Sequence, residues 1–313
     1  MTDFGADGSF AQAMDKLVEH YGVMLPESTM RRITETHAQA IFKTRAHETA
    51  WPTVPGVATV IAQMDGGMVP LVEPDATQPD QRKGKQLFWK EAKICLAHAK
   101  GSVTPVYGGT LAGDVAVAGQ ALFSCARAAG FGEDTHVHAV GDGAPWITDQ
   151  VEERFGAQAS YLIDFYHVCD YLSAAASALT PTADAATVWM NEQKERLKTN
   201  CTEEVLQTLQ AHLEPANVAD ADAPVRACHR YLGNRAHQLN YRGALAEELP
   251  IGSGEIESAH RYLVQQRLKR PGAWWRRENA EHMLALRIHR ANHRWRDYWA
   301  RPTTQAAGVS TSV

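Results

Sequence analysis

Residues 57–67 read VATVIAQMDGG, and residues 136–143 read HVHAVGDG. Each stretch is an apolar, β-branched run that closes on an aspartate followed by glycine, a pattern that predicts a strand ending in an acid. The glycines allow a sharp backbone turn and the close approach of a large ligand. Ligands of α/β sheets collect at the carboxyl ends of the strands. We therefore predict that Asp65 and Asp142 end adjacent parallel strands and meet at one edge of a sheet.

The surrounding sequence alternates between strand and helix patterns, which predicts an α/β sheet flanked by helices. MVPLV continues or pairs with the first strand, and the run KQLFWKEAKICLAHA favours a strand over a helix. The expected strands and helices up to the last core strand are a first strand at 57–65 with 68–72, strands at 85–99, 104–111, 136–142 and 160–167, and a helix at 114–130.

The second half of the chain changes character. Residues 180–248 are polar and helical, which indicates an insertion into the core, and GSGEIES at 252–258 opens a long helix. One further helix is expected over about 280–299. The resulting division is an N-terminal helical segment at 1–50 that is a candidate for DNA binding, the first part of the core at 51–179, the insertion at 180–248, the end of the core at 249–300, and a mobile tail at 301–313.

Two amphipathic helices are expected near the N-terminus, over about 9–21 and from Met30 to Ile41, separated at Gly22. Arg31 and Arg32 open the second helix, where the recognition helix of a helix-turn-helix would meet DNA. An ordinary helical hairpin that packs on the core explains the same pattern.

Composition narrows the class of protein. Hydrophobic residues make up 44% of 313 and charged residues 21%, which fits a globular protein. The net charge of −5 argues against a nucleic-acid binder that uses its whole surface, although one face can still be basic. The five cysteines are widely spaced without a C-x-x-C pair, as expected of a reduced, cytosolic protein without a cysteine zinc site. Neither a membrane span nor a signal peptide is expected.

Two carboxylates at one sheet edge repel each other unless a cation lies between them. Mg²⁺ takes oxygen ligands and leaves positions open for phosphate oxygens. Two such ions about 3.5–4 Å apart can clamp the attacking and leaving oxygens of a displacement at phosphorus. This chemistry needs a third acid from elsewhere in the chain.

Three motifs carry a resemblance to a known family: VGDGAPWI (140–147), DFYHVCDYL (164–172) and IGSGEIESAHRYLVQQRLKRPGAWW (251–275). Together they resemble bacterial insertion-sequence DDE transposases, mostly the Kra-type group and more distantly Mutator-like enzymes. The resemblance runs from about residue 9 to about 290. It implies an RNase H-like core with a helical insertion before the last acid. Members usually carry more sequence before the helix-turn-helix-like part, so a longer full-length protein or a compact relative is expected.

By this resemblance, Asp65, Asp142 and Glu257 match the three acids that hold two Mg²⁺ ions, for which Mn²⁺ can substitute. Glu255 competes with Glu257, but residues two apart on a helix point about 200° apart, so only one can face the site. His167 belongs to an Asp-x-x-His motif and is either a catalytic acid or base or a residue that orients Asp164. 

The resemblance also implies that the protein binds double-stranded DNA, both the terminal repeats of the element and the target. It implies a homodimer or higher oligomer on DNA, located in the prokaryotic cytoplasm with the nucleoid. Residues 255–301 carry eleven Lys and Arg against five Asp and Glu, which suits phosphate contacts or merely a solvated helix face. Trp146 can stack on an extruded base or pack in the core. The expected DNA-binding residues are Arg31, Arg32, Trp146, Arg261, Arg267, Lys269, Arg270 and Trp275.

The expected activity is cleavage of one strand at an element end, followed by attack of the freed 3′-hydroxyl on target DNA. Two alternatives remain from the sequence: an RNase H-like nuclease that cleaves without joining, and a transposase-derived DNA-binding protein without catalysis.

Overall fold

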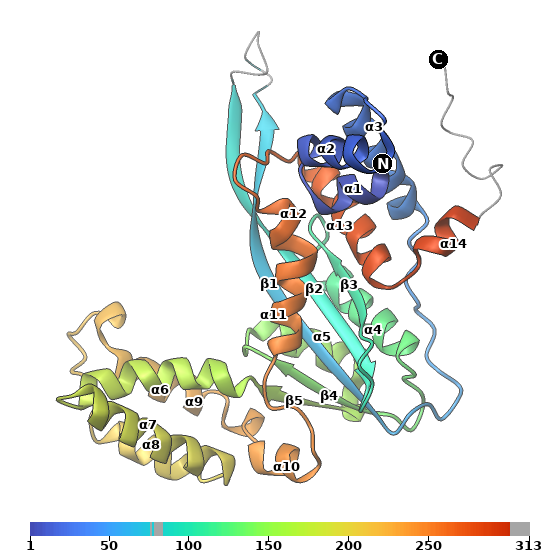
Figure 1. Ribbon diagram of the computed structural model, residues 1–313. Helices are drawn as coiled ribbons and strands as arrows, with labels where there is room; N and C mark the ends of the chain where they lie inside the picture. The colour runs from blue at the N-terminus through green and yellow to red at the C-terminus, as the bar shows by residue number, and fades with distance from the viewer. Residues whose placement is uncertain (76, 78–83, 301–313) are drawn as a thin grey trace.

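A mixed sheet forms the centre of the computed structural model, which describes residues 1–75, 77 and 84–300 (Figure 1). Within these residues the sheet has five strands in the order β3-β2-β1-β4-β5. The strands are β1 (Thr59–Pro74), β2 (Lys85–Ala99), β3 (Val106–Thr110), β4 (His136–Gly141) and β5 (Ala159–Ile163). β1, β2 and β3 pair antiparallel, whereas β4 and β5 run parallel to β1. This order, with helices on both faces, is that of an RNase H-like core, so the expected fold class is confirmed.

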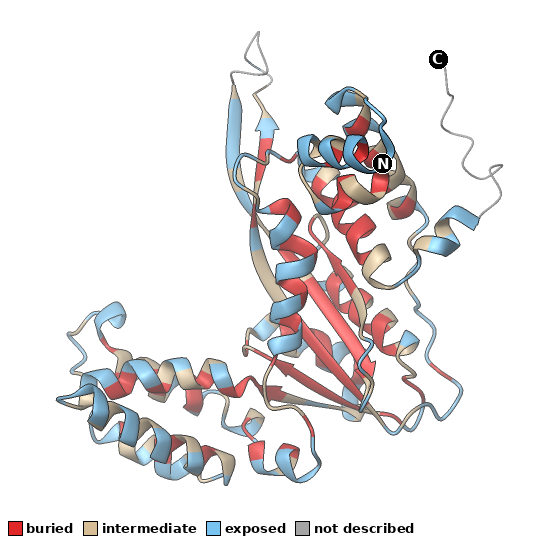
Figure 2. Ribbon diagram, in the orientation of Figure 1, coloured by how far each residue is buried: buried red, intermediate tan, exposed pale blue. Residues whose placement is uncertain are grey.

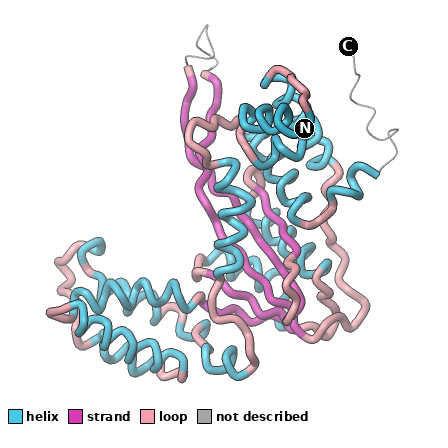
Figure 3. Tube along the Cα trace, viewed as in Figure 1, coloured by secondary structure: helices cyan, strands magenta, loops and turns pink. Residues whose placement is uncertain are grey.

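Helices cover both faces of the sheet, and further helices form one group at the N-terminus and another that stands to the side of the sheet (Figure 3). They are α1 (Thr2–Asp7), α2 (Phe10–Tyr21), α3 (Glu27–Lys43), α4 (Val115–Ala128), α5 (Pro145–Phe155), α6 (Phe165–Leu179), α7 (Ala183–Lys198), α8 (Thr202–Gln210), α9 (Pro224–Gly233), α10 (Tyr241–Ala246), α11 (Gly254–Ala259), a π-helical turn (His260–Gln265), α12 (Gln266–Leu268), α13 (Arg277–Ala291) and α14 (Trp295–Ala300). None of the helices that the structure describes has the length and apolar character needed to cross a membrane.

The alternation of side chains along β1 builds a core on each face of the sheet. Val60 and Met64 pack with α4 and α5, whereas Val69 and Leu71 pack with the segment from α11 to α13. The strands are accordingly buried where helices cover them, whereas the outer end of β2 is largely exposed (Figure 2). 

The first strand is longer than its sequence pattern predicts. Asp65 was expected to end it, but β1 continues to Pro74, and residues 68–72 are its continuation. Because β2 pairs with β1 along this whole length, the two strands extend beyond the rest of the sheet as a β-hairpin (Figure 1). Asp65 therefore lies where β1 leaves the sheet, and not at a strand end.

The helices α7 to α10 stand to one side of the sheet and pack on α6 (Figure 1). This helical excursion leaves the core after β5 and returns to it before α11. Its two ends meet, because the Phe165 N–H donates to the Ile251 carbonyl at 2.8 Å. The excursion is the expected helical insertion before the last acid.

The C-terminal helix is broken where a single helix was predicted. α13 ends at Ala291 and α14 begins at Trp295, and between them His293 adopts a left-handed conformation with φ of 57°. A residue with positive φ cannot continue a right-handed helix, so the chain changes direction there. The expected tail at 301–313 lies outside the described residues.

The N-terminal helices pack on the C-terminal ones. Ser9 and Gln12 form a capping box at the start of α2, and Gly22 ends that helix with φ of 64°. Ala38 and Ile41 of α3 belong to the same apolar core as α13. The helical hairpin therefore packs on the core.

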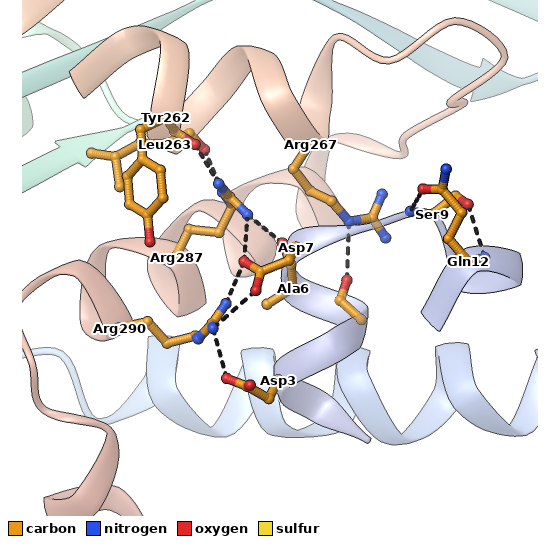
Figure 4. A network of polar contacts seen from close by, with 11 residues as sticks. Asp3, Ala6, Asp7, Ser9, Gln12, Tyr262, Leu263, Arg267, Arg287 and Arg290 are labelled. Carbon is orange, nitrogen blue, oxygen red and sulfur yellow. Dashed lines mark hydrogen bonds and ion pairs between the residues drawn. The ribbon is translucent and has the colours of Figure 1, made fainter. Parts of the chain in front are cut away.

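α1 had no clear signal in the sequence and is held by arginines from the C-terminal segment (Figure 4). Arg267 donates to the Gly5 carbonyl at 3.0 Å, and Arg290 forms ion pairs with Asp3 and Asp7 at 2.6 Å. Arg287 donates to the carbonyls of Ala6, Tyr262 and Leu263, the last two in the π-helical turn. α1 is thus coupled to the helix that follows α11.

Candidate active site

The pairing of β1 with β4 brings the first two acids together. Paired residues differ by 77 positions, from Thr59 with His136 to Gln63 with Val140. Asp65 and Asp142 continue this register by two residues and so point to the same face. Neighbouring strands lie about 4.8 Å apart, so the two aspartates are near neighbours although β4 ends at Gly141.

Asp65 occupies a half-buried position against the π-helical turn. Its Oδ1 accepts a hydrogen bond from the Gly66 N–H at 2.7 Å. The Nε2 of buried His260 lies 3.4 Å from Oδ2 and 3.1 Å from the Asp65 carbonyl oxygen. Burial raises the pKa of Asp65, His260 and the Gly66 hydrogen bond oppose the rise, and Asp142 and Glu91 add to it. Negative charge therefore gathers at this point.

Asp142 lies in the turn between β4 and α5. Its Oδ1 accepts from the Ala144 N–H at 2.8 Å, and Gly143 turns the chain with φ of 82°. The helical excursion holds this turn from outside: the Tyr231 hydroxyl donates to the Asp142 carbonyl at 2.7 Å, and Arg235 donates to the Gly143 carbonyl. Asp142 is thus fixed by α9 as well as by the sheet.

Asp164 joins the end of β5 to the start of α11. It is buried, and its Oδ1 caps α6 by accepting from the N–H groups of Tyr166 and His167 at 2.6 and 3.3 Å. Its Oδ2 accepts from the N–H of Ser253 at 2.9 Å and from the Ser253 hydroxyl. Because all four contacts are internal, Asp164 positions the GSGE turn.

The two glutamates of α11 face different partners. Glu255 lies 2.9 Å from Nε2 of His98, which raises the pKa of that histidine, and 3.5 Å from the Gln63 amide nitrogen. Glu257 instead faces a cavity of about 230 Å³ that contains both aspartates. The residues that line this cavity are Met64, Asp65, Asp142, Asp164, His167, Ser253 and Glu257. We call Asp65, Asp142 and Glu257 the acid cluster.

His167 lines the same cavity, and its ring lies against Tyr171 and Tyr231 with centroids 5.6 and 5.7 Å away. Its backbone N–H binds Asp164, so it takes part in the capping of α6. Trp146 packs on the α4–α5 core, and the Lys93 ammonium lies 5.6 Å from its ring centre. Packing accounts for its position.

Sequence reasoning missed three residues that surround or support the acid cluster. Gln63 is buried and accepts the Ile256 N–H at 3.0 Å, which fixes α11 against β1. Glu91, across the hairpin, adds charge near Asp65. His260 follows Glu257 by three residues, a spacing that places both side chains on one helix face and that could have identified it. It begins a π-helical turn, a feature frequent at functional sites.

The acid cluster offers the oxygen ligands that Mg²⁺ prefers, and its charges repel one another without a cation. In the part of the chain that the structure describes, no three His, Cys, Asp or Glu side chains already stand close enough to bind one metal ion. Glu257 is exposed, and described residues give its carboxylate no hydrogen bond, so it is free to turn toward the aspartates. The donor set fits divalent cations, with this movement of Glu257.

The basic residues expected to bind DNA divide into exposed and buried ones. Arg31, Arg32, Arg261 and Lys269 are exposed and Arg270 is half-buried. The two other residues, Arg267 and Trp275, are buried. Arg267 is 2% exposed, with its guanidinium between the rings of Phe10 and Trp275 at 4.6 and 4.7 Å, and Trp275 is 4% exposed. Both are enclosed by the α1–α2 region, which a local charge pattern cannot show.

The fold and the acid cluster define an RNase H-like α/β protein with a carboxylate site beside its central strands. The chain matches the family described as "Uncharacterised protein family (UPF0236)" over residues 131–299, more than half of its length, and belongs to that family. No curated protein matches the chain. The matched region includes Asp142, Glu257 and the helical excursion between them.

Proposed function

We propose that this protein is a DDE-type DNA transposase, a metal-dependent polynucleotidyl transferase that cleaves and joins strands at insertion-sequence ends. One observation carries the proposal: Asp65, Asp142 and Glu257, which lie far apart in the sequence, line one cavity on an RNase H-like sheet. The resemblance of the three motifs to bacterial insertion-sequence transposases supports the same activity.

The chain's own residues would each have a defined task. Asp65 and Asp142 hold two carboxylates on a rigid sheet, and Glu257 supplies the third from a helix fixed by Gln63 and Asp164. Divalent cations, when bound there, supply the positive charge that activates water and stabilises the phosphoryl oxygens. His260 restrains Asp65, and His167 faces the cavity within reach of a substrate.

The test is a nicking assay on a supercoiled plasmid that carries the DNA flanking the coding sequence, with Mg²⁺ or Mn²⁺. We expect nicking by the wild type and none by Asp142→Ala. Glu257→Gln should also be inactive, because it keeps the shape but loses the charge. Glu255→Gln is the matched control, because Glu255 faces His98, and it should retain most activity. Thermal melts check that each variant folds.

Each other outcome selects an alternative. Nicking without joining of a pre-cut 3′ end to a target plasmid would indicate a nuclease that only cleaves. DNA binding without metal-dependent nicking would indicate a transposase-derived binding protein. An inactive Glu255→Gln beside an active Glu257→Gln would contradict the assignment of the third acid.

A further inference from the structure

A second cavity, of about 880 Å³, lies between α3, the outer end of β2 and the loop that joins α12 to α13. It shares no lining residue with the cavity of the acid cluster. Its functional side chains come from three elements far apart in the sequence: Arg31 and Arg32, Lys85, and Arg270, Trp274 and Arg276.

The lining carries more positive than negative charge. Its five exposed or half-buried cations are Arg31, Arg32, Lys85, Arg270 and Arg276, and none of them forms an ion pair with any residue the structure describes. Three glutamates also line the cavity. One of them, Glu35, already accepts a hydrogen bond from Asn279 at 3.1 Å. The cavity as a whole therefore attracts anions.

The wall of the cavity holds a buried cation that lacks a full set of partners. Arg267 is 2% exposed and lines the cavity, and its Nη2 has no hydrogen-bond partner among the described residues. The indole N–H of Trp275, beside it, is likewise buried without one. Burial, with repulsion from Arg287 and Arg270, lowers the pKa of Arg267 to about 10. An anion in the cavity would relieve this accumulation of positive charge.

An aromatic platform stands next to these cations. Trp274 is 58% exposed, and the Lys85 ammonium lies 5.8 Å from its ring centre. Base–aromatic stacking contributes about 1–3 kcal/mol for each base. Bases within a duplex are covered on both faces by their neighbours, so a tryptophan can stack only on a base that is unpaired and turned out. Clustered cations around one exposed indole favour a single strand over a duplex.

We propose that this cavity binds an unpaired segment of a polynucleotide strand, with a base stacked on Trp274 and the phosphates bound by arginines of α3 and of the 270–276 loop. The inference deepens the proposed function, since it assigns a strand-binding site to the same substrate class, but the binding itself needs no metal ion.

The strand β1 fixes the distance between this site and the acid cluster. The loop is attached to β1 where the Val72 N–H donates to the Trp275 carbonyl at 2.8 Å and Leu71 forms a bridge with Trp275. Leu71 is six residues from Asp65 along the strand, which corresponds to roughly 20 Å. Stacked DNA advances 3.4 Å per nucleotide of one strand. The site is thus held on the order of 20 Å from the acid cluster, a distance that stacked duplex DNA between them would span in about six nucleotides.

The test measures binding of a fluorescein-labelled oligothymidylate and of a duplex of equal length by fluorescence anisotropy, with EDTA present. We expect Trp274→Ala to weaken binding of the single strand about tenfold, within the range expected for one stacked base, and Trp274→Phe to restore most of it. Trp89→Ala is the matched control, because Trp89 is 55% exposed and lies outside the cavity. It should bind as the wild type does.

The phosphate contacts are tested by salt dependence. Replacing Arg31 and Arg32 with alanine should lower the slope of log affinity against log salt by about 0.7 for each lost contact to a single strand. Arg242→Ala, an exposed arginine on α10, should leave the slope unchanged. Equal affinities of Trp274→Ala and Trp89→Ala, or binding of the duplex alone, would overturn the proposal. Because EDTA removes metal ions, this binding assay does not depend on catalysis. A protein that fails to nick DNA can still pass it, and a protein that fails it can still be tested for nicking.

Discussion

Arg267 shows how a residue that reads as a DNA contact can instead be part of the core, and its replacement tests that assignment. We expect Arg267→Ala to lower the free energy of unfolding by about 3 kcal/mol, in the range for truncating a large buried side chain. Arg267→Met, which refills the space without a charge, should lower it by only about 1 kcal/mol.

The magnitude follows from the contacts. The hydrogen bond from Arg267 to the Gly5 carbonyl, made by a charged group, contributes about 2 kcal/mol, and the two ring contacts contribute about 1 kcal/mol each. Burial opposes this, since it lowers the pKa from 12.5 to about 10, which corresponds to about 3 kcal/mol. The charged group therefore makes almost no net contribution to the free energy of unfolding. Most of the loss in the alanine variant comes from the space left between Phe10 and Trp275.

The assay is urea denaturation followed by circular dichroism, with Arg270→Ala as the control. Arg270 is half-buried and its guanidinium makes no hydrogen bond or ion pair with the described residues, so its loss should change the free energy of unfolding by less than about 0.5 kcal/mol. An Arg267→Ala variant as stable as Arg270→Ala would refute the reasoning, whatever its affinity for DNA.

Three further predictions concern the support of the site. Gln63→Ala should lower the free energy of unfolding by about 1 kcal/mol in urea melts, since α11 loses its hydrogen bond to β1 while the Ile256 N–H keeps the Ser253 carbonyl at 3.0 Å; an unchanged midpoint would contradict this. Asp164→Ala should be more severe, about 3 kcal/mol or more, because it removes the α6 cap and both contacts to Ser253, and wild-type stability of this variant would refute that role. Burial lowers the pKa of His138 below its usual 6.5, so the unfolded protein binds a proton at this histidine at a higher pH than the folded protein does. The free energy of unfolding should be intact above about pH 6.5 and should fall as the pH drops below it. The fall should be smaller in His138→Gln, and equal pH profiles of the two proteins would contradict this.

The sequence contained enough to predict the order of strands and helices and the positions of the acids. Strand-then-acid-then-glycine patterns located Asp65 and Asp142, because they depend on local alternation and turn residues. The same patterns placed the end of the first strand at Asp65 and left residues 68–72 open as its continuation or its partner, whereas β1 runs through them, paired with β2 and bridged to Trp275. Pairing across a hairpin is a tertiary effect and leaves no mark in one strand alone.

Burial of charge was the least predictable property. Arg267 and Arg287 lie in a segment whose composition indicates a basic surface, but both are buried because α1 covers them and offers backbone carbonyls. α1 itself is six residues long and contains a glycine, too short to be recognised by periodicity. The unexpected burial of the arginines and the unrecognised α1 have one cause. α1 and the arginine-bearing segment each take their structure from contacts with the other, more than 250 residues away.

The meeting of the two ends of the helical excursion has an evolutionary consequence. Because Phe165 and Ile251 are hydrogen-bonded, the excursion is a loop whose ends are closed at the core. The entropic cost of closing such a loop depends only weakly on its length. Insertions and deletions between its outer helices are thus compatible with an unchanged sheet. α9 and the residues that follow it are constrained, because Tyr231 and Arg235 contact the turn that carries Asp142. Relatives should therefore vary most in the connections α7–α8 and α8–α9 and least at Tyr231 and Arg235. The excursion can then differ in size between relatives while its contacts with the turn that carries Asp142 are conserved.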